Sequence, residues 1–209
     1  MKADVFRPQS AGRAVRTAFV LGVLLVIAIV AAVGAFGNFS ALVGDNTKDE
    51  LSRYLDDNAH TTIKPKGGGF QLDFPVPPTR QSERVATDAG AVDAPRDGVI
   101  VDDEIIFDVV WFDVPGTAPI DSTRLLRSLI DKQIGQLSAT KVAVGTRKKV
   151  GIGAGRAFVA VNVDQNGLKR YYDEEIVVKG RKVWIMRIGS RIRRSAAFAR
   201  FTGSFTITG

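Results

Sequence analysis

The chain has 209 residues, of which 45% are hydrophobic and 24% are charged, and its formal net charge at pH 7 is +7. It contains no cysteine, which excludes a disulfide framework, a thiolate metal site, a cysteine nucleophile and a lipid-modified cysteine. Its one histidine, His60, disfavours Ser-His-Asp chemistry and metal sites built from several histidines. This length allows one or two domains, each with a core of its own.

An uncharged, apolar stretch occupies residues 17–44. As a helix, its 28 residues would measure roughly 40 Å at about 1.5 Å per residue, and the hydrocarbon core of a bilayer is about 30 Å thick. We therefore predict a single transmembrane helix that crosses the membrane with some tilt. The large apolar side chains that anchor it in the lipid are Phe19, Leu24, Leu25, Ile27 and Ile29.

Small residues recur at four-residue spacing within this stretch, in the pairs Ala28 with Ala32 and Ala31 with Ala35. Such pairs let a second helix approach closely. Because alanine is common in membrane spans, a helix that faces lipid on all sides is the favoured alternative.

The flanks of the stretch indicate its orientation. Residues 1–16 carry four basic side chains and one acidic side chain, whereas acidic residues predominate just after residue 44. The positive-inside rule places 1–16 in the cytoplasm and the later residues outside the bacterial cytoplasmic membrane. A cleaved signal peptide is the alternative, since small residues occupy 33–35. The stretch exceeds the roughly 7–15 apolar residues of a signal peptide, so a retained, single-pass anchor is favoured.

Residues 45–69 are predicted to connect this anchor to a folded domain. Apolar residues three to four positions apart give 48–57 the pattern of a short amphipathic helix, which lies either on the membrane surface or on the domain. Residues 64–69, Lys-Pro-Lys-Gly-Gly-Gly, have the composition of a linker. We therefore draw the boundary there, and predict an extracytoplasmic domain over 70–209.

The first half of this domain contains a predicted hairpin followed by a helix. Glu104–Val114 is apolar at nearly every position, which is typical of a central strand covered on both faces. It pairs with Gly98–Val101 through an Asp-Asp turn. After Pro115, either Asp121 or Ser122 caps a helix whose apolar stripe should lie on one face of the sheet.

The second half alternates short β-rich runs with turn signals. Asn166 and Gly167 supply the positive φ angles of a tight turn between two strands. The predicted order is an α+β fold with an antiparallel sheet and helices packed on it. The strands are expected at 141–150, 156–163, 168–178, 181–188 and 204–208, with a second helix at 194–201.

The order of several motifs in 70–209 resembles the PsbP-like family, which is named for an extrinsic protein of photosystem II. The phenylalanine and Phe-Pro steps that open that domain are matched at 70–75, and an aromatic residue followed by Asp-x-Pro at 112–115. Further packing and turn motifs are similar at Gly153–Phe158, where Ala154 stands in place of a frequent proline, at Gly180–Trp184, where lysine and tryptophan are substituted, and at Phe201–Ile207. The resemblance implies a PsbP-like α/β/α sandwich and a non-enzymatic role as an accessory, assembly or binding module.

The residues nominate no catalytic group, cofactor or metal site. The acidic clusters Asp102–Glu104 and Asp173–Glu175 lack the alternating ligand spacing of a calcium loop. The glycine-rich run Gly151–Gly155 precedes a strand-like segment rather than a helix, so a turn is favoured over a phosphate-binding loop. Without an acid/base pair or an activated nucleophile, we predict that the protein is not an enzyme.

Charge is distributed unevenly along the chain. Residues 45–140 contain 17 acidic and 10 basic side chains, and residues 141–209 contain 4 acidic and 15 basic side chains. Arginine clusters suit an anionic lipid headgroup, an acidic envelope polymer or an acidic partner protein, whereas nucleic acid is disfavoured. A surface neutralised by the acidic half is a slightly favoured alternative. The candidate binding residues are Arg147, Lys148, Lys149, Arg187, Arg191, Arg193 and Arg194.

Two hypotheses follow for function. The first is a membrane-anchored, extracytoplasmic accessory or assembly subunit that docks on a larger membrane complex, with the bilayer and other subunits of that complex as its partners. The second is a binding module for an anionic lipid or cell-envelope ligand, which uses the basic C-terminal half.

Overall fold

The computed structural model describes residues 50–56 and 59–208. The predicted span at 17–44, with its anchor residues and its small-residue pairs, lies outside the described residues. Among those that are described, no helix has both the length and the apolar character needed to cross a membrane.

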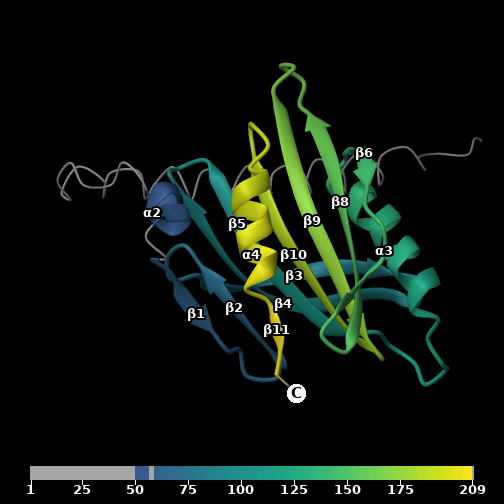
Figure 1. The fold of residues 1–209 in the computed structure, drawn as a ribbon. Helices are drawn as coiled ribbons and strands as arrows, with labels where there is room; N and C mark the ends of the chain where they lie inside the picture. Colours follow the sequence, from purple (N-terminus) through teal and green to yellow (C-terminus); the bar gives the residue numbers. More distant parts are fainter. Residues whose placement is uncertain (1–49, 57–58, 209) are drawn as a thin grey trace, which may run out of the picture. The chain divides into compact units, whose positions relative to one another are not determined.

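An antiparallel sheet of eight strands forms the centre of the domain (Figure 1). The strands lie in the order β3-β4-β5-β10-β9-β8-β6, and β7 also pairs with β8. Their bounds are β3 Thr79–Thr87, β4 Gly90–Val101, β5 Ile105–Asp113, β6 Thr140–Val144, β7 Lys148–Val150, β8 Gly153–Val163, β9 Lys169–Lys179 and β10 Lys182–Ser190.

The predicted central strand is confirmed, because β5 pairs with β4 on one side and with β10 on the other. Its side chains from Phe107 to Phe112 are buried on both faces of the sheet. The strand predicted at 141–150 is instead two short strands, β6 and β7, with residues 145–147 between them. The predicted tight turn at Gly167 is present with a φ of +78°.

Helix α3, Ser122–Gln136, covers one face of the sheet, as predicted. Asp121 is its N-cap: the carboxylate Oδ1 accepts hydrogen bonds from the backbone N–H groups of Thr123 at 2.8 Å and Arg124 at 3.3 Å. The helix buries Leu126 and Leu129 against apolar side chains of the sheet.

The opposite face carries two helices and a small sheet. Its aromatic core places Phe74 and Phe107 edge-on against Phe201, with ring centroids 5.1 and 5.3 Å apart. The indole N–H of Trp184 donates a 2.9 Å hydrogen bond to the carbonyl of Gly68, which ties the two sheets together. The elements on this face are α2 Glu50–Asp56, α4 Ser195–Gly203, β1 Thr61–Ile63, β2 Phe70–Phe74 and β11 Thr206–Ile207.

Helix α2 lies on the domain, which decides between the two positions that the sequence left open. Leu51 and Tyr54 are buried in the aromatic core, and the Arg200 guanidinium lies 4.7 Å from the centre of the Tyr54 ring. Residues 64–69, predicted as a linker, form the turn between β1 and β2, which pair antiparallel. The folded unit therefore includes residues on the N-terminal side of residue 70.

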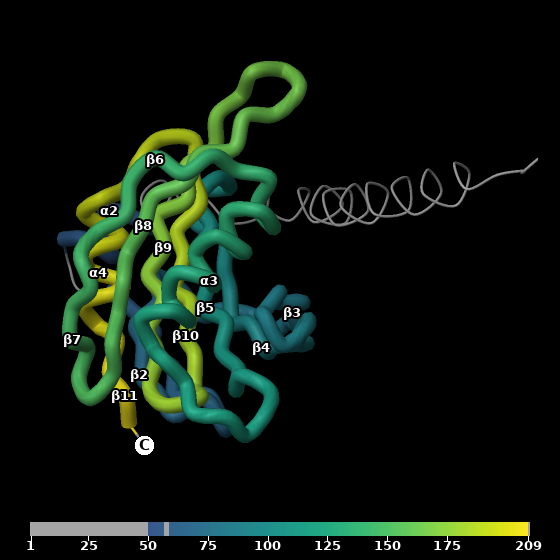
Figure 2. The backbone as a smooth tube through the Cα atoms, turned by 90° about the vertical axis from the view of Figure 1, so that its right-hand side faces the viewer, coloured from purple at the N-terminus to yellow at the C-terminus, as the bar shows by residue number. Residues whose placement is uncertain are grey.

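The two ends of the large sheet differ in what they present. The β8–β9 hairpin extends past the other strands, and the connection from β10 to α4 lies at the same end (Figures 1 and 2). We call this the hairpin end. The turn between β7 and β8, which contains Ile152, lies at the other end of β8.

Candidate anion-binding site

Arg187, nominated as a surface cation, lies inside the sheet. It is 6% exposed and lies on the same face of β10 as Val183 and Ile185, which belong to the core under α3. Its Nη2 lies 2.9 Å from Oε2 of Glu83 and 3.1 Å from Oδ2 of Asp108. Arg187 is therefore a structural ion-pair residue, and its guanidinium is not available to an external ligand.

A buried charge network surrounds Arg187 across five neighbouring strands. Arg96 on β4 donates from Nη2 to Asp108 Oδ2 at 2.7 Å, and its Nε lies 3.7 Å from Glu83. Gly98 leaves room for this contact, because a Cβ there would lie 3.1 Å from the Asp108 Cβ. We define the buried charge network by three carboxylates and two guanidiniums: Glu83, Arg96, Asp108, Glu174 and Arg187.

The network has one more carboxyl group than guanidiniums, and Glu174 is this surplus acid. It has no exposed surface, and neither of its carboxyl oxygens has a hydrogen-bond partner among the described residues. Burial raises the pKa of Glu174 to about 8, although the Arg187 charge opposes that rise. A protonated Glu174 leaves two carboxylates against two guanidiniums, so the buried network is balanced at neutral pH.

Three other nominated cations also have partners within the domain. Arg193 Nη2 donates to Asp173 at 2.8 Å, and Lys148 Nζ lies 2.8 Å from Glu175. Arg147 donates to the hydroxyls of two residues at the start of α3. The structure does not bring the cluster at 147–149 together with the cluster at the end of β10, since Lys148 pairs with the start of β8.

The last three nominated residues differ in burial. Arg194 precedes α4, is half-buried, and has a buried Nε without a partner among the described residues. Lys149 and Arg191 are both exposed. Arg191 alone among the nominated residues lines a cavity of about 200 Å³ at the hairpin end.

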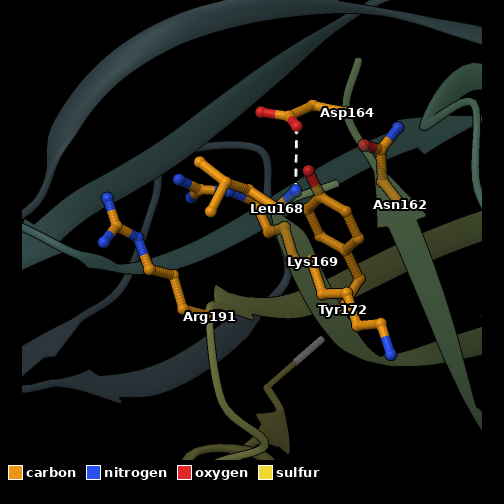
Figure 3. Close-up of a pocket in the computed structure, with 7 residues that line it drawn as sticks. Asn162, Asp164, Leu168, Lys169, Tyr172 and Arg191 are labelled. Carbon is orange, nitrogen blue, oxygen red and sulfur yellow. Dashed lines mark hydrogen bonds between the residues drawn. The ribbon is translucent and has the colours of Figure 1, made fainter. Parts of the chain in front are cut away.

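This cavity, drawn in Figure 3, combines the β8–β9 hairpin with the start of the β10–α4 connection. In that view Leu168 lies between Arg191 and Asn162. We call it the hairpin cavity, and its lining residues are Asn162, Asp164, Leu168, Lys169, Arg170, Tyr172 and Arg191.

Hydrogen bonds hold the hairpin in shape beside the cavity. Oδ1 of Asp164 accepts from the backbone N–H groups of Asn166 at 2.8 Å and Leu168 at 2.9 Å. Nδ2 of Asn162 donates to the carbonyls of Leu137 at 2.9 Å and Ser138 at 3.0 Å. These contacts fix the hairpin turn and tie its base to the end of α3.

Tyr172 lines the hairpin cavity and lies on β9 between Arg170 of that cavity and Glu174 of the buried charge network. It lies opposite Gly189 on β10, and a Cβ at Gly189 would come within 3.1 Å of the ring carbon Cε1. Because Gly189 has no side chain, the Tyr172 ring has room to lie across the neighbouring strand. Burial raises the pKa of Tyr172 above its ordinary value, so the phenol stays protonated and remains a hydrogen-bond donor.

Lys169, Arg170 and Arg191 give the cavity its charge. None of these cations forms an ion pair with a carboxylate in the part of the chain that the structure describes. Asp164 is the acid of the lining, and its Oδ1 is occupied by the hairpin N–H groups. The lining therefore carries an excess of two positive charges.

Apolar side chains are exposed around the same cavity. Val163 and Leu168 flank the hairpin turn and are 53% and 55% exposed, and Ile192, next to Arg191, is 55% exposed. The hairpin end thus combines unpaired cations with apolar surface. We define its surface by six residues: Val163, Leu168, Lys169, Arg170, Arg191 and Ile192.

The sequence alone did not nominate Lys169, Arg170 or Tyr172. Strand alternation places residues 170, 172 and 174 on one face of β9, and this pattern could have indicated that Arg170 and Tyr172 lie on the same side of the sheet. That signal becomes specific only with the register, which sets Tyr172 opposite Gly189. Within the described residues, no group of three or more acidic or histidine side chains is close enough together to hold a metal ion.

Comparisons with known proteins establish the fold class. No protein-family model matches the sequence, and no curated protein matches it either. The solution structure of cyanobacterial PsbP (CyanoP) from Synechocystis is similar with a TM-score of 0.51 and 11% identity, over 71% of this chain and 92% of that one.

Two weaker structural similarities have TM-scores below 0.5. The Ran-binding protein Mog1p of Saccharomyces cerevisiae has a TM-score of 0.43 and 8% identity, over 71% of this chain and 95% of its own. LpqN, involved in cell envelope biogenesis of Mycobacterium tuberculosis, has a TM-score of 0.36 and 17% identity, over 76% and 97%. From the similarity to CyanoP and the element order, the described part of the chain has a PsbP-like α+β fold.

Proposed function

We propose that this protein is a non-catalytic, membrane-anchored accessory or assembly subunit whose extracytoplasmic domain docks on a larger membrane complex through the hairpin end. The partner surface is acidic with apolar patches, so that it matches the cations and the exposed apolar side chains of that end. The uncharged stretch at 17–44 supplies the anchor in this proposal.

The observation that carries the proposal is the composition of the hairpin end. Single exposed apolar residues are common on protein surfaces, but Val163, Leu168 and Ile192 are each more than half exposed, and each lines the hairpin cavity or is next in sequence to a residue that does. Three cations beside them lack ion pairs among the described residues, whereas Arg187 and Arg193 are paired inside the domain. Arginine and exposed apolar side chains together are typical of interface centres.

Affinity purification from gently solubilised membranes tests this proposal when it includes matched variants. We expect the wild-type chain to recover a companion protein in stoichiometric amount. The double variant Leu168→Glu/Ile192→Glu should lose that companion, because it buries two carboxylates in the interface. Ile152→Glu is the control, since Ile152 is 70% exposed but lies at the other end of β8.

Recovery of the chain alone, or a companion that the double variant retains, would contradict the proposed docking. Loss of the companion from the Ile152→Glu variant as well would place the interface elsewhere. Thermal unfolding of each variant separates a lost interface from a lost fold, because all three positions are exposed.

A second candidate function is a binding module for an anionic lipid or cell-envelope ligand. The hairpin cavity supports it, because its lining carries excess positive charge and a neutral phenol donor. A module with both properties would sit at the membrane surface and present the same end of the sheet to lipid headgroups.

A further inference from the structure

We propose that the hairpin cavity binds a phosphoryl group, with Arg170 and Arg191 as its charge partners and the Tyr172 hydroxyl as a hydrogen-bond donor. The inference deepens the second candidate function, on which it rests, by naming the chemical class of the ligand and the residues that hold it.

The charge of the cavity lining favours a phosphoryl ligand. Guanidinium groups donate paired N–H bonds that match phosphate oxygens, and charge-assisted bonds of this kind are stronger than neutral ones. Two larger cavities in the described part of the chain, of about 370 and 430 Å³, each contain a cation that a carboxylate already pairs: Arg80 with Asp97, and Lys182 with Asp113. In the hairpin cavity, none of the three cations has such a pair among the described residues.

The size of the cavity is the second argument. Pockets for drug-sized ligands measure about 300–1,000 Å³. The hairpin cavity, at about 200 Å³, is smaller than that range and suits a compact anion or the headgroup end of a larger molecule. A nucleotide or a folded acidic segment would not fit inside it.

Rigidity is the third argument. Sites on strands hold their donors more precisely than sites on loops. Lys169, Arg170 and Tyr172 belong to β9, and the turn before them is fixed by the two hydrogen bonds to Asp164. Arg191 follows β10 directly, where the Ser190 hydroxyl bonds the carbonyl of Ile192.

The surrounding acids do not fill the cavity. The carboxylate of Asp164 is part of the lining, but its Oδ1 is used by backbone N–H groups of the turn. The acidic turn at 102–104 lies at the same end of the sheet, beyond Ile106, and none of its side chains lines the cavity. The cations of the cavity are therefore open to an external anion.

Two sources supply a phosphoryl group of this size. One is free phosphate or a phosphate monoester, which is a dianion near neutral pH. The other is the phosphodiester of an anionic lipid headgroup, whose glycerol and acyl parts would lie against Leu168 and the neighbouring apolar side chains. Soluble analogues of each distinguish the two.

The test is calorimetric titration of the full-length chain in a non-ionic detergent, first with inorganic phosphate and then with glycerophosphoglycerol. We expect saturable binding of at least one of them. Arg191→Ala and Tyr172→Phe should each weaken it, with the arginine variant losing about tenfold, the loss typical of one charge-assisted hydrogen bond. Lys149→Ala, which removes an exposed cation outside the cavity, should bind like the wild type.

The results distinguish the two sources of the phosphoryl group, and they test the phosphoryl site separately from the proposed docking. Tighter binding of glycerophosphoglycerol identifies a lipid headgroup, and tighter binding of phosphate identifies a free anion or monoester. Absence of saturable binding for both probes, or equal weakening by Arg191→Ala and Lys149→Ala, would overturn the inference. Binding that persists when the companion protein is not recovered shows that the phosphoryl site stands without the proposed docking.

Discussion

Arg187 on β10 and Glu174 on β9 are directly opposite in the sheet register, and the Arg187 Nη1 lies 3.9 Å from the Glu174 Oε1. Arg187 directs its hydrogen bonds to Asp108 and Glu83, so Glu174 has a nearby charge but no hydrogen bond within residues 50–56 and 59–208. The domain thus contains a buried acid that, when ionised, gives the surrounding network one more negative charge than positive charges. The first prediction follows from this pair.

Glu174→Gln should remove a pH dependence of stability. Burial raises the pKa of Glu174 to about 8, from an ordinary value of 4.5. Between these values the folded chain keeps a proton that the unfolded chain has lost, so the free energy of unfolding falls as pH rises and levels off above about 8. Urea unfolding should show the variant more stable than wild type near pH 9, by on the order of 3 kcal/mol.

Glu175→Gln is the control for that experiment. Glu175 is the next residue on the same strand, but its side chain faces the other side of the sheet and pairs with Lys148. The control should retain the fall in stability between pH 5 and 8 that we expect for wild type. If Glu174→Gln follows the wild-type curve at every pH, the surplus-acid account of the network is wrong.

Arg187→Met and Arg191→Met should differ strongly in stability, although both arginines belong to one basic cluster of the sequence. Removing Arg187 leaves the buried Asp108 and the partly exposed Glu83 with only Arg96 as a partner, which should cost about 3–5 kcal/mol. Arg191 is exposed, so its replacement should change stability by less than about 0.5 kcal/mol. Denaturant unfolding measures both, and similar costs would refute the buried position of Arg187.

Tyr54→Ala tests whether the segment before residue 70 is part of the domain. The Tyr54 ring is fully buried, lies edge-on to Phe107 with centroids 5.8 Å apart, and contacts Arg200. Its truncation should lower the free energy of unfolding by about 3–5 kcal/mol. Tyr54→Phe, which loses the 3.3 Å bond to the carbonyl of Asp73 and the hydrogen bond between the hydroxyl and Arg200, should cost about 1–2 kcal/mol, less than Tyr54→Ala. An unchanged midpoint for Tyr54→Ala would mean that α2 does not pack there.

Two glycine-to-alanine variants should change stability in opposite directions. At Gly189 the new Cβ would lie 3.1 Å from Tyr172, so the ring must shift, and we expect a loss of about 1 kcal/mol together with weaker phosphate binding. At Gly135 in α3 the new Cβ meets nothing within 4 Å, so the better helix propensity of alanine should stabilise the domain by about 0.5–1 kcal/mol. Thermal unfolding and phosphate titration measure the two effects, and a Gly189→Ala variant with wild-type binding would contradict the role of Tyr172.

The sequence predicted those elements that a few neighbouring residues define, such as a helix cap or an apolar strand. Asp121 caps α3 because a carboxylate before an apolar stripe satisfies the first free N–H groups of a helix. β5 is apolar on both faces and is central. By contrast, the first strand of the large sheet, β3, was not predicted, because its positions from Thr79 to Arg84 are exposed or partly exposed and all carry polar side chains.

The site was harder to predict because it depends on contacts between distant strands. The basic run from Arg187 to Arg194 suggested one surface cluster, but the end of a strand falls inside it, after Ser190. Arg187 is therefore paired with residues of three other strands, and Arg191 joins the hairpin at 162–172. Only the register of β9 on β10 reveals this division.

Site-specific photocrosslinking in intact membranes tests the central claim most directly, namely that the hairpin end is the docking surface. A photoreactive amino acid is placed at Leu168 or at Ile192, and for comparison at Ile152, which is equally apolar and 70% exposed at the other end of β8. We expect one shared crosslinked protein from positions 168 and 192 and none from 152. Crosslinks to that protein from 152 but not from 168 or 192 would contradict it.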